Sequence, residues 1–464
     1  MFMDDQRLAT TTGLSVGVPG EVLGFYEVHK EYGKLPWKDL FTDAIEISKK
    51  FKVSNILEQK LIKNSKYIFD DPGLKSTYTR NEDLVKEGDI IERDNLSKTL
   101  EILSNDPLSF YTGTLAKQIV DFLNSKGGVF TLEDLKEYEV KKRSVLKGHF
   151  YDFQVYTTNL PTSGLFIIEA LKILERINIR DLFILSNNEN SFYLYHILIE
   201  VFKFMAAERG KFEDPEFLDK WQKKVSLIIS DIKATSIFRQ FSLKNAMSSE
   251  EYRNIPFYKE DHGTTHLNVI DKDGMIVSLT STINLEFGSK LLDPITGIIF
   301  NNQIDDFYIP GIDNTFGLEK MPANILEGGK RPFSSAAPTI LIKDNEILII
   351  GAAGGTRIPT AIITTIVYLL AGNTLERAVS LCRIHNQLFP IKTMIEPTLP
   401  DRITEKLREM GHEIEFSELN TSFSSVQAIY LRKSTDNTST NGKGGDVRIE
   451  AISDKRKQGL SDGK

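Results

Sequence analysis

The sequence of 464 residues is 41% hydrophobic and 26% charged, which is the composition of an ordinary globular protein with ample length for a large core. Its 57 basic and 64 acidic residues give a net charge of −7, and this argues against a nucleic-acid partner because a phosphate backbone requires a basic face. Cys382 is the only cysteine, and the seven histidines lack paired metal-ligand spacing, so we expect no disulfide, no metal site and no cofactor.

Apolar residues at helical spacing predict a largely helical first half that serves as a scaffold. The start of the chain lacks the basic-then-apolar pattern of a signal peptide, and no run is long enough to span a membrane. The expected elements are helices over residues 22–32, 38–50, 115–124, 165–177 and 191–209, a short helix that starts at the capping-box pattern of Thr131, and a strand over residues 150–157.

Ser163 lies in the turn Leu160-Pro161-Thr162-Ser163-Gly164, between an expected strand and an expected helix. A serine in such a turn is typical of a nucleophile elbow, but the G-x-S-x-G spacing is absent and no histidine partner is in the required order. We therefore prefer a structural turn at this position.

The clearest local signal is a β-hairpin in the middle of the chain. Residues 265–270 and 275–281 are rich in Leu, Val, Ile and Thr. They flank Asp271-Lys272-Asp273-Gly274, which has the Asp-Gly chemistry of a hairpin turn. The polar residues 233–261 that precede the hairpin suit an exposed, flexible segment.

Three hydroxyl groups gather at one end of this hairpin if the turn has four residues. In that register Thr264 lies opposite Ser281 and beside Thr282. Such a group has two interpretations, ordinary cross-strand hydrogen bonds or part of a polar site. The hydroxyls alone favour the first, whereas the polar run over residues 301–306 on the other side of the hairpin favours a site.

Glycine-rich stretches in the second half invite two nucleotide-binding interpretations, and both fail on spacing. Gly328-Gly329-Lys330 lacks the remainder of a phosphate-binding loop and is followed by an expected strand over residues 339–343. Gly354-Gly355 lies between an expected strand over 347–352 and a buried helix over 358–371, but the G-x-G-x-x-G pattern is absent.

Cys382, in an amphipathic run, is expected to be a buried structural residue.

Several motifs occur together in the order and spacing of one family. They are Gly263-Thr264-Thr265-His266, Thr280-Ser281-Thr282-Ile283-Asn284, Asn301-Asn302-Gln303-Ile304-Asp305-Asp306-Phe307, Arg331-Pro332-Phe333-Ser334-Ser335 and Gly351-Ala352-Ala353-Gly354-Gly355. With these motifs the sequence resembles the gamma-glutamyltranspeptidases, also called glutathione hydrolases, over nearly the whole chain. The resemblance implies an α+β fold of the N-terminal-nucleophile hydrolase type, a four-layer αββα sandwich whose N-terminal strands are missing from this chain.

In that family the precursor cuts itself before a threonine, which becomes the nucleophile. Transferred here, the cut falls between Gly263 and Thr264, and it leaves a large-subunit portion of residues 1–263 and a small subunit of residues 264–464 that stay associated in one structural domain. The chemistry suits threonine, because the freed α-amine has an ordinary pKa of about 7.7–8.0 and can accept the proton of the weakly nucleophilic hydroxyl. Gly263 tolerates the strained backbone that attack on its carbonyl requires.

The resemblance also implies roles for residues around the nucleophile. Thr282 supports Thr264, and Gly354 and Gly355 form the oxyanion hole, for which backbone N–H groups at a helix start are suited.

Substrate binding is assigned by the same resemblance to five further residues. Asn284, Gln303 and Asp306 hold the α-amino and α-carboxylate ends of the γ-glutamyl group, and Ser334 and Ser335 hydrogen-bond its α-carboxylate. Many family members have Glu at the position of Gln303, so the charge at this position differs here. The implied substrates are glutathione and other γ-glutamyl compounds, with water, amino acids or dipeptides as acceptors.

Family members also carry an N-terminal anchor or signal, early core strands and an arginine for the substrate α-carboxylate, and this sequence has no counterpart to them before Gly17. The resemblance therefore implies an N-terminally truncated relative, whose complete form belongs to the secretory pathway at the plasma membrane, outside the cell or in the vacuole. Two hypotheses follow, a self-cleaving γ-glutamyl hydrolase and transferase, or an inactive relative that acts as a binding or regulatory protein.

Overall fold

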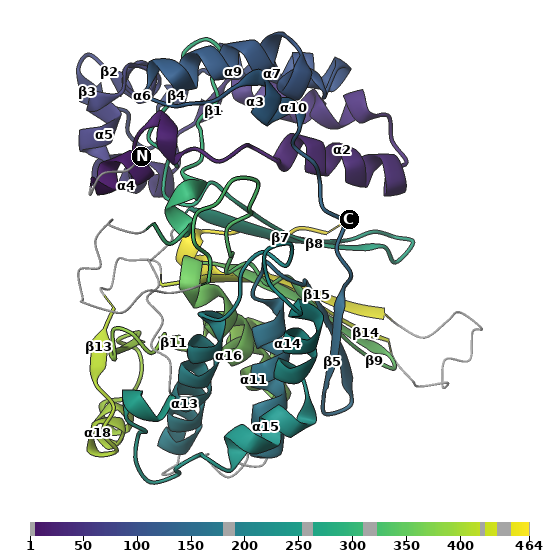
Figure 1. Ribbon diagram of the computed structural model, residues 1–464, viewed down its shortest axis with the longest axis vertical. Helices are drawn as coiled ribbons and strands as arrows, with labels where there is room; N and C mark the ends of the chain where they lie inside the picture. Colours follow the sequence, from purple (N-terminus) through teal and green to yellow (C-terminus); the bar gives the residue numbers. More distant parts are fainter. Residues whose placement is uncertain are drawn as a thin grey trace. The chain divides into compact units, whose positions relative to one another are not determined.

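The computed structural model describes residues 5–179, 191–252, 263–309, 323–417, 423–433 and 447–463. The chain divides into two compact units (Figure 1). Unit 1 comprises Met1–Lys142 and Thr282–Thr315, and unit 2 comprises Arg143–Ser281 and Phe316–Lys464. The chain therefore enters unit 1 twice, and the boundary between Ser281 and Thr282 falls inside the second strand of the hairpin, Ile276–Thr282.

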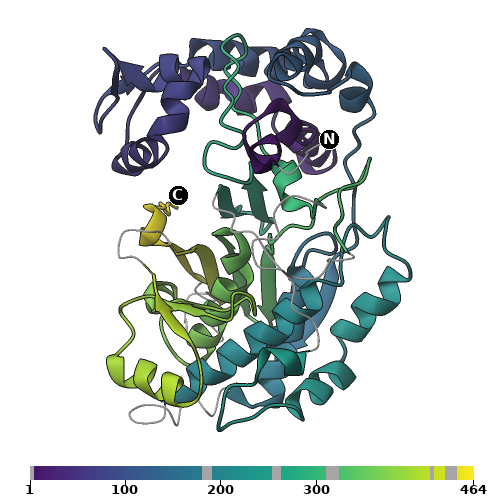
Figure 2. The same ribbon diagram turned by 60° about the vertical axis from the view of Figure 1, so that its left-hand side comes forward.

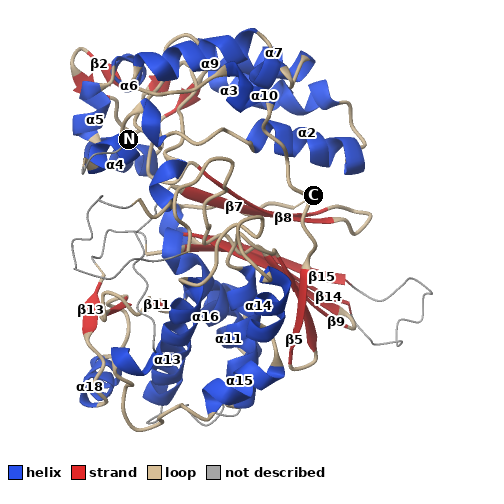
Figure 3. Cartoon of the chain, viewed as in Figure 1, coloured by secondary structure: helices blue, strands red, loops and turns tan. Residues whose placement is uncertain are grey.

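Unit 1 is mainly helical, with short two-stranded ladders between β1 and β4 and between β2 and β3 (Figure 3). Its helices are α1 Gln6–Thr10, α2 Glu21–Tyr32, α3 Thr42–Lys49, α4 Asn55–Lys63, α5 Ser65–Asp70, α6 Pro72–Tyr78, α7 Asp94–Asn105, α8 Ser109–Thr112, α9 Thr114–Ser125 and α10 Leu132–Lys136. Its strands are β1 Phe51–Lys52, β2 Thr79–Arg80, β3 Asp83–Leu84 and β4 Ile90–Ile91, and its 3-10 helices are η1 Gly13–Ser15, η2 Trp37–Phe41 and η4 Gln303–Asp306.

Local sequence explains where several helices of unit 1 begin. Asp71 accepts a hydrogen bond from the Leu74 N–H and precedes a proline at the first position of α6, where a missing N–H costs nothing. Thr131 and Asp134 form a reciprocal capping box at α10, as the sequence predicts. The amphipathic α9 buries its apolar face with Phe300, so the late segment of unit 1 packs into the core that the early helices build.

Unit 2 contains the larger sheet and the longer helices. Its strands are β5 Leu146–Phe150, β6 Phe153–Thr157, β7 Thr264–Ile270, β8 Ile276–Thr282, β9 Thr339–Lys343, β10 Glu346–Ala353, β11 Ile384–His385, β12 Thr393–Ile395, β13 Ile414–Phe416, β14 Ser425–Lys433 and β15 Val447–Ser453. Its helices are α11 Gly164–Arg176, α13 Ser191–Arg209, α14 Trp221–Ile228, α15 Asp231–Phe238, α16 Ile358–Leu370, α17 Leu375–Ser380 and α18 Asp401–Glu409, with 3-10 helices η3 Ser249–Tyr252, η5 Gly355–Arg357 and η6 Lys455–Lys457.

A six-stranded antiparallel sheet with the order β15-β14-β10-β9-β6-β5 forms the centre of unit 2. On β10, Ile350 and Ala352 face a core shared with α11 and α16. Gly351, on the opposite face, lies under the hairpin of β7 and β8. Unit 2 therefore has three layers, helices, a six-stranded sheet and a two-stranded sheet (Figure 1), and the turned view brings α18 and β13 forward (Figure 2).

Most expected elements are confirmed, with two differences in their limits. The strand expected over residues 150–157 begins only at Phe153, because Tyr151 takes a positive φ of 49° in the turn between β5 and β6. The helix expected over residues 38–50 starts as the 3-10 helix η2 and becomes α3 at Thr42. Of the flexible segment expected over 233–261, the first residues form α15 and η3, and residues 253–261 lie outside the described residues.

The hairpin forms, but its register is shifted by one residue from the expected one. The Asp271 N–H donates to the Met275 carbonyl at 3.0 Å, and the Asp271 side chain accepts from the Met275 N–H at 2.8 Å. The turn therefore has three residues and ends in Gly274, whose φ of 85° is typical of the glycine in a bulged three-residue turn. Thr265, rather than Thr264, lies opposite Ser281, so the expected pairing is wrong.

Two structural expectations outside the hairpin are confirmed. Ser163 is fully buried and its hydroxyl donates to the Ser334 carbonyl at 3.0 Å, which is the behaviour of a structural turn. Cys382 is buried, and burial raises the pKa of its thiol to about 11, so the reactive thiolate is scarce at neutral pH.

Among the described residues, none of the helices combines the length and the apolar character needed to cross a bilayer.

A buried ion pair ties the end of β15 to the segment that follows α17. Arg383 is 0% exposed and Asp454 is 2% exposed, and Nη2 of the arginine lies 3.2 Å from Oδ2 of the aspartate. The same carboxylate accepts from the Val426 N–H of β14 and from the Arg456 side chain. Removal of one partner of such a pair leaves an uncompensated buried charge.

We expect Asp454→Ala to lower the free energy of unfolding by about 3–5 kcal/mol, because Arg383 loses its carboxylate while it stays buried. Urea unfolding followed by circular dichroism measures the change. Glu405→Ala, which removes a carboxylate from the exposed face of α18, is the control and should change stability by no more than about 0.5 kcal/mol. Equal effects of the two substitutions would contradict a specific role for the pair.

Candidate active site

The buried face of β7 carries three polar side chains at every second position. Thr264 is 9% exposed, His266 is 6% exposed, and Asn268 is partly buried, whereas Thr265 and Leu267 are exposed. This alternation follows from the two-residue period of a strand. The expectation that Thr265 points to the opposite face from Thr264 is therefore confirmed.

A hydrogen-bond relay crosses from the hairpin to the large sheet through His266. Nδ1 of His266 lies 2.8 Å from the Thr280 hydroxyl, and Nε2 lies 3.0 Å from Oδ1 of Asn268. Nδ2 of Asn268 donates to the Gln427 carbonyl of β14 at 2.8 Å, which fixes the amide so that Oδ1 faces the imidazole. Oδ1 can only accept, so the imidazole carries its proton on Nε2 and Nδ1 accepts from Thr280.

The imidazole is held neutral by its surroundings. Burial lowers the pKa of His266 to about 4, because the charged form loses its hydration. A Cβ atom on Gly351 would lie 2.1 Å from Cε1 of His266, so only glycine at this position of β10 leaves room for the ring. The close approach of the two sheets therefore depends on Gly351.

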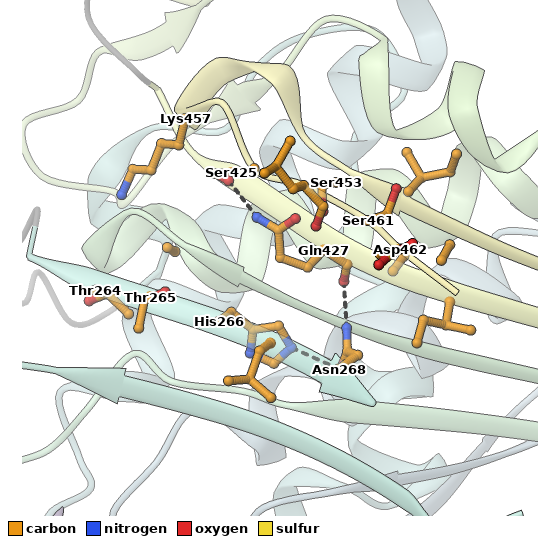
Figure 4. A pocket seen from close by; sticks show the side chains of 18 residues that line it. Thr264, Thr265, His266, Asn268, Ser425, Gln427, Ser453, Lys457, Ser461 and Asp462 are labelled. Carbon is orange, nitrogen blue, oxygen red and sulfur yellow. Dashed lines mark hydrogen bonds between the residues drawn. The ribbon is translucent and has the colours of Figure 1, made fainter. Parts of the chain in front are cut away.

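Thr264 lines a pocket of about 360 Å³ between β7 and the last strands of the chain. Ser425 and Gln427 of β14, Ser453 at the end of β15 and Lys457 of η6 supply polar groups to it. Figure 4 shows these side chains across the pocket from β7, with the Gln427 amide donating to the Ser425 hydroxyl. The pocket is large enough and polar enough for a small polar ligand.

Gly354 and Gly355 form the turn from β10 into η5 and α16. Their φ angles are 137° and 59°, which residues with a Cβ adopt only with strain. A Cβ atom on Gly354 would lie 3.0 Å from Cα of Ser424. Nε of Arg357 donates to the Gly354 carbonyl at 3.4 Å, so the carbonyl side of this turn is held while the helix start presents its N–H side.

The segment with Ser334 and Ser335 is held by side chains far away in the sequence. Ser334 donates its N–H to the Pro161 carbonyl at 2.8 Å, and the Ala336 N–H donates to the Ser334 hydroxyl at 3.1 Å. Upstream, the fully buried Asp214 accepts from the Arg331 N–H at 2.9 Å and from Arg143 at 3.0 Å. The backbone that carries the two serines is therefore held by Pro161 and Asp214, which lie far away in the sequence.

The remaining predicted residues belong to unit 1. The Asn284 N–H donates to Oγ1 of Thr282 at 2.9 Å, and Asn284, at a φ of 70°, uses its side-chain amide to donate to the Asn302 carbonyl at 3.1 Å. Gln303 and Asp306 lie on the single turn η4, where Nε2 of the glutamine donates to Oδ2 of the aspartate. The 3-10 turn thus brings together two of the residues that the resemblance assigns to the α-amino and α-carboxylate ends of the substrate.

Within each unit the structure groups the predicted residues by element. Unit 2 holds Gly263, Thr264, Ser334, Ser335, Gly354 and Gly355, and unit 1 holds Thr282, Asn284, Gln303 and Asp306.

Several supporting residues were missed by sequence reasoning. His266 and Asn268 share the face of Thr264, and the two-residue period of the hairpin was a signal that could have found them. Asp214 gave no such signal, and the polar run over residues 301–306 contains Asn301 without indicating what it binds. Asn301, which binds the backbone of Gly17 through both ends of its amide, has its partner 284 residues away.

The fold of the chain is that of the N-terminal-nucleophile hydrolases. Cephalosporin acylase from Bacillus halodurans, a solved structure, superposes with a TM-score of 0.77 over 96% of this chain and 78% of its own, at 21% identity. A strand that begins at a threonine and packs face to face on a larger sheet with helices behind it is consistent with this class.

The gamma-glutamyltranspeptidase family profile matches residues 1–463, and the chain belongs to this family. Glutathione hydrolase proenzyme 1 of Schizosaccharomyces pombe is 35% identical over 470 residues, which cover 99% of this chain and 72% of the relative. The glutathione hydrolase proenzyme of Escherichia coli is 32% identical over 443 residues, which cover 92% of this chain and 74% of the relative.

His266 should make stability depend on pH. Its pKa of about 4 in the folded chain is below the value of about 6.5 in the unfolded chain, so the unfolded state binds more protons as the pH falls through this window. Between pH 7 and pH 4.5 this group alone should remove about 2.5 kcal/mol of stability. We expect His266→Gln to abolish that part of the loss, measured by urea unfolding at the two pH values.

Leu267→Gln is the matched control, because it places the same amide on the exposed face of the same strand. It should retain the full pH-dependent loss of the unsubstituted chain. If His266→Gln retained the full loss as well, the buried neutral imidazole would not be its source.

Proposed function

We propose that the chain is a glutathione hydrolase that also transfers γ-glutamyl groups, and that it acts through a γ-glutamyl-threonine ester at Thr264. Membership of the gamma-glutamyltranspeptidase family supports the reaction class. The observation that carries the assignment of the nucleophile is the place of Thr264, which begins β7 directly after Gly263 and turns its side chain into a pocket.

The first step is self-cleavage between Gly263 and Thr264. Oγ1 of Thr264 attacks the Gly263 carbonyl carbon, the C–N bond breaks, and the acyl group moves from nitrogen to oxygen. Water then hydrolyses this ester, which leaves a carboxylate on Gly263 and a free α-amine on Thr264. Gly263 favours the attack because a residue without Cβ can enter the strained backbone conformation that the attack requires.

In the catalytic cycle the α-amine of Thr264 acts as the base. It takes the hydroxyl proton while Oγ1 attacks the γ-carbonyl carbon of the substrate, and the same proton then passes to the departing amine. Hydrolysis of the threonine ester by water, or its attack by an acceptor amino acid or dipeptide, releases the γ-glutamyl group. The neutral His266 on the same face supports this role, because a cationic imidazole would lower the pKa of a nearby amine.

Gly354 and Gly355 are proposed to stabilise the oxyanion that forms at the γ-carbonyl. Two backbone N–H groups at the start of η5 and α16 are preorganised donors, and such donors typically contribute about 3–4 kcal/mol each to lowering the barrier. The positive φ angles of both residues support the proposal, because they present a turn of the backbone that is free of side chains.

The amino-acid end of the γ-glutamyl group is assigned to five residues. Asp306 is proposed to bind the α-ammonium, and the hydrogen bond from Gln303 orients its carboxylate. Asn284, Ser334 and Ser335 are assigned to the α-carboxylate, with Thr282 as support for the nucleophile. These roles, and a location in the secretory pathway, rest on the family resemblance.

The proposed fragments would stay together, because the cut divides a sheet rather than separating two domains. Strands β5 and β6 precede the cut, whereas β9, β10, β14 and β15 follow it. The ladder between β6 and β9, from Gln154↔Ile342 to Thr157↔Thr339, joins the two sets within one sheet. Residues 1–263 and 264–464 are therefore proposed as two subunits of one folded body.

Self-cleavage is tested by denaturing gel electrophoresis of the purified chain. We expect two bands, of residues 1–263 and 264–464, whose N-terminal sequencing places Thr264 at the start of the second. Thr264→Ala should give a single full-length band, because the attacking hydroxyl is absent, and Thr264→Ser should still be cleaved. Both variants should keep the circular dichroism spectrum of the fold.

Thr265→Ala is the matched control, since it removes a hydroxyl one residue away on the exposed face. It should be cleaved like the unsubstituted chain. A single band from the unsubstituted chain, unchanged by Thr264→Ala, would contradict the proposal and would favour a binding or regulatory relative.

Recognition of the substrate amino group is tested by Asp306→Asn. We expect a fall of about 10- to 100-fold in kcat/KM for a γ-glutamyl chromogenic amide, because a charge-assisted hydrogen bond is worth about 1.5–3 kcal/mol. Self-cleavage on the gel should be unaffected, since no substrate takes part in it. Asp121→Asn, on the exposed face of α9, should leave both readouts unchanged.

A further inference from the structure

Two histidines and a glutamate meet in the interior of unit 2, away from the candidate active site. His196 and Glu200 are one turn apart on α13, so their side chains leave the same face of the helix. His412 follows the C-terminus of α18, which packs beside α13. One ring nitrogen of each histidine and a carboxylate oxygen of Glu200 lie within 4.8 Å of one another, and all three residues are buried.

The hydrogen bonds of the two histidines define their protons. Nε2 of His196 lies 2.7 Å from the Ser242 carbonyl, so this nitrogen carries a proton and donates it. Nδ1 of His196 then carries no proton and has a free lone pair. It lies 2.7 Å from Nε2 of His412, which must donate to it. Nδ1 of His412 therefore also carries no proton. Among the described residues it has no hydrogen-bond partner, although the side chain is only 4% exposed.

Glu200 retains capacity for one further partner. Its Oε1 accepts from Lys203 at 2.8 Å, and its Oε2 accepts from the Tyr252 hydroxyl and from the Met247 N–H. A carboxylate offers about four lone-pair sites, and these three bonds leave one of them. Two imidazoles, joined by one hydrogen bond, and a carboxylate with a free lone-pair site therefore converge at one buried place.

We propose that His196, Glu200 and His412 form a binding site for a divalent transition-metal ion of the zinc class. Imidazole nitrogen and carboxylate oxygen are ligands that zinc accepts, and three protein ligands leave a fourth position for water. His196 binds through Nδ1 and His412 through Nε2, whose proton moves to Nδ1 of the same ring, so both rings stay neutral. The metal–nitrogen distance of about 2.0–2.1 Å requires the two nitrogens to move apart by about 0.6 Å.

The surroundings of His196 are those of a metal ligand. The Ser242 carbonyl that accepts from Nε2 fixes the tautomer and the orientation of the ring, which is the common arrangement behind a zinc-bound histidine. Because His196 and Glu200 lie one turn apart on α13, the helix fixes the spacing of their backbone positions.

Lys203 is the group that opposes the metal. Its ammonium is buried, occupies Oε1 of Glu200 and places a positive charge beside the site. The ion must therefore displace or share this interaction, and a variant without the ammonium should bind the metal more tightly. Loss of a ligand should therefore weaken metal binding, whereas loss of the Lys203 ammonium should strengthen it. A cluster that makes only structural hydrogen bonds predicts no such opposite effects.

The metal would also join the two proposed fragments. His196 and Glu200 precede the bond between Gly263 and Thr264, and His412 follows it, so one ion would cross-link the chains after the cut. This consequence rests on the proposed function. Metal binding by the uncut chain does not, so the two proposals fail separately.

The test uses the full-length chain purified from cells grown with added cobalt or zinc. Elemental analysis should give one ion per chain, and the cobalt form should show the visible d–d absorption of a four- or five-coordinate ion. His412→Gln, which keeps a polar side chain, should lose the ion and the absorption. Lys203→Met should bind at least tenfold more tightly in a competition with a chromophoric chelator.

Two further measurements guard against misfolding and surface binding. His149→Ala removes an exposed imidazole that lies 3.6 Å from Glu175, and it should bind metal like the unsubstituted chain. Zinc should raise the Tm of the unsubstituted chain by roughly 3 °C at a hundredfold excess over Kd, and should not raise that of His412→Gln. No bound ion in the folded unsubstituted chain, retention of the ion by folded His412→Gln, or weaker binding by Lys203→Met would overturn the proposal.

Discussion

The hairpin of β7 and β8 lies with a polar face against the large sheet of unit 2, and this constraint governs the candidate active site. Hydroxyl, imidazole and amide groups between two sheets cost free energy unless each finds a hydrogen-bond partner. The relay from Thr280 through His266 and Asn268 supplies those partners and ends on the backbone of β14. Because β14 is fixed in the sheet, the hairpin has one position along it, and Thr264 is placed two residues before the imidazole.

In unit 2, a buried network of charged side chains and the uncharged polar face of β7 occupy different places. The buried pair Arg383 and Asp454 lies next to α17, where Arg456 and Glu396 complete the network. The face of β7, by contrast, is polar but uncharged, since burial keeps His266 neutral. Neutral surroundings suit the proposed nucleophile, because neighbouring charge would shift the pKa of the amine that is proposed as its base.

Much of the fold was predictable, because most helices and strands have a clear apolar period and clear caps. The failures have local causes. The turn after Asp271 was assigned four residues, but a glycine with positive φ permits a three-residue turn with a bulge, and the choice is made by packing of the hairpin on β10 and β14. Tyr151 ends the first strand of the β5–β6 pair in a conformation that the sequence around it does not signal.

The candidate site was predictable only where motifs are contiguous. Thr264, Gly354 and Ser334 stand in short recognisable motifs, whereas Asp214, which holds the segment before Ser334, lies 117 residues from its partner Arg331. The buried group of His196, Glu200 and His412 shows the same limit, since no sequence spacing connects α13 to the end of α18. Long-range pairs of this kind are set by the fold, and an isolated sequence contains no local pattern for them.

The strand order of the six-stranded sheet has a consequence for biosynthesis. Its members come from residues 146–157, 339–353 and 425–453, so the earliest hairpin waits for partners that leave the ribosome much later. During that interval the open edge of β6 and the apolar face of α11 have no sheet to pack on. Contacts of such long sequence separation fold slowly and expose aggregation-prone surface, so the nascent chain should depend on chaperones until the last strand is complete.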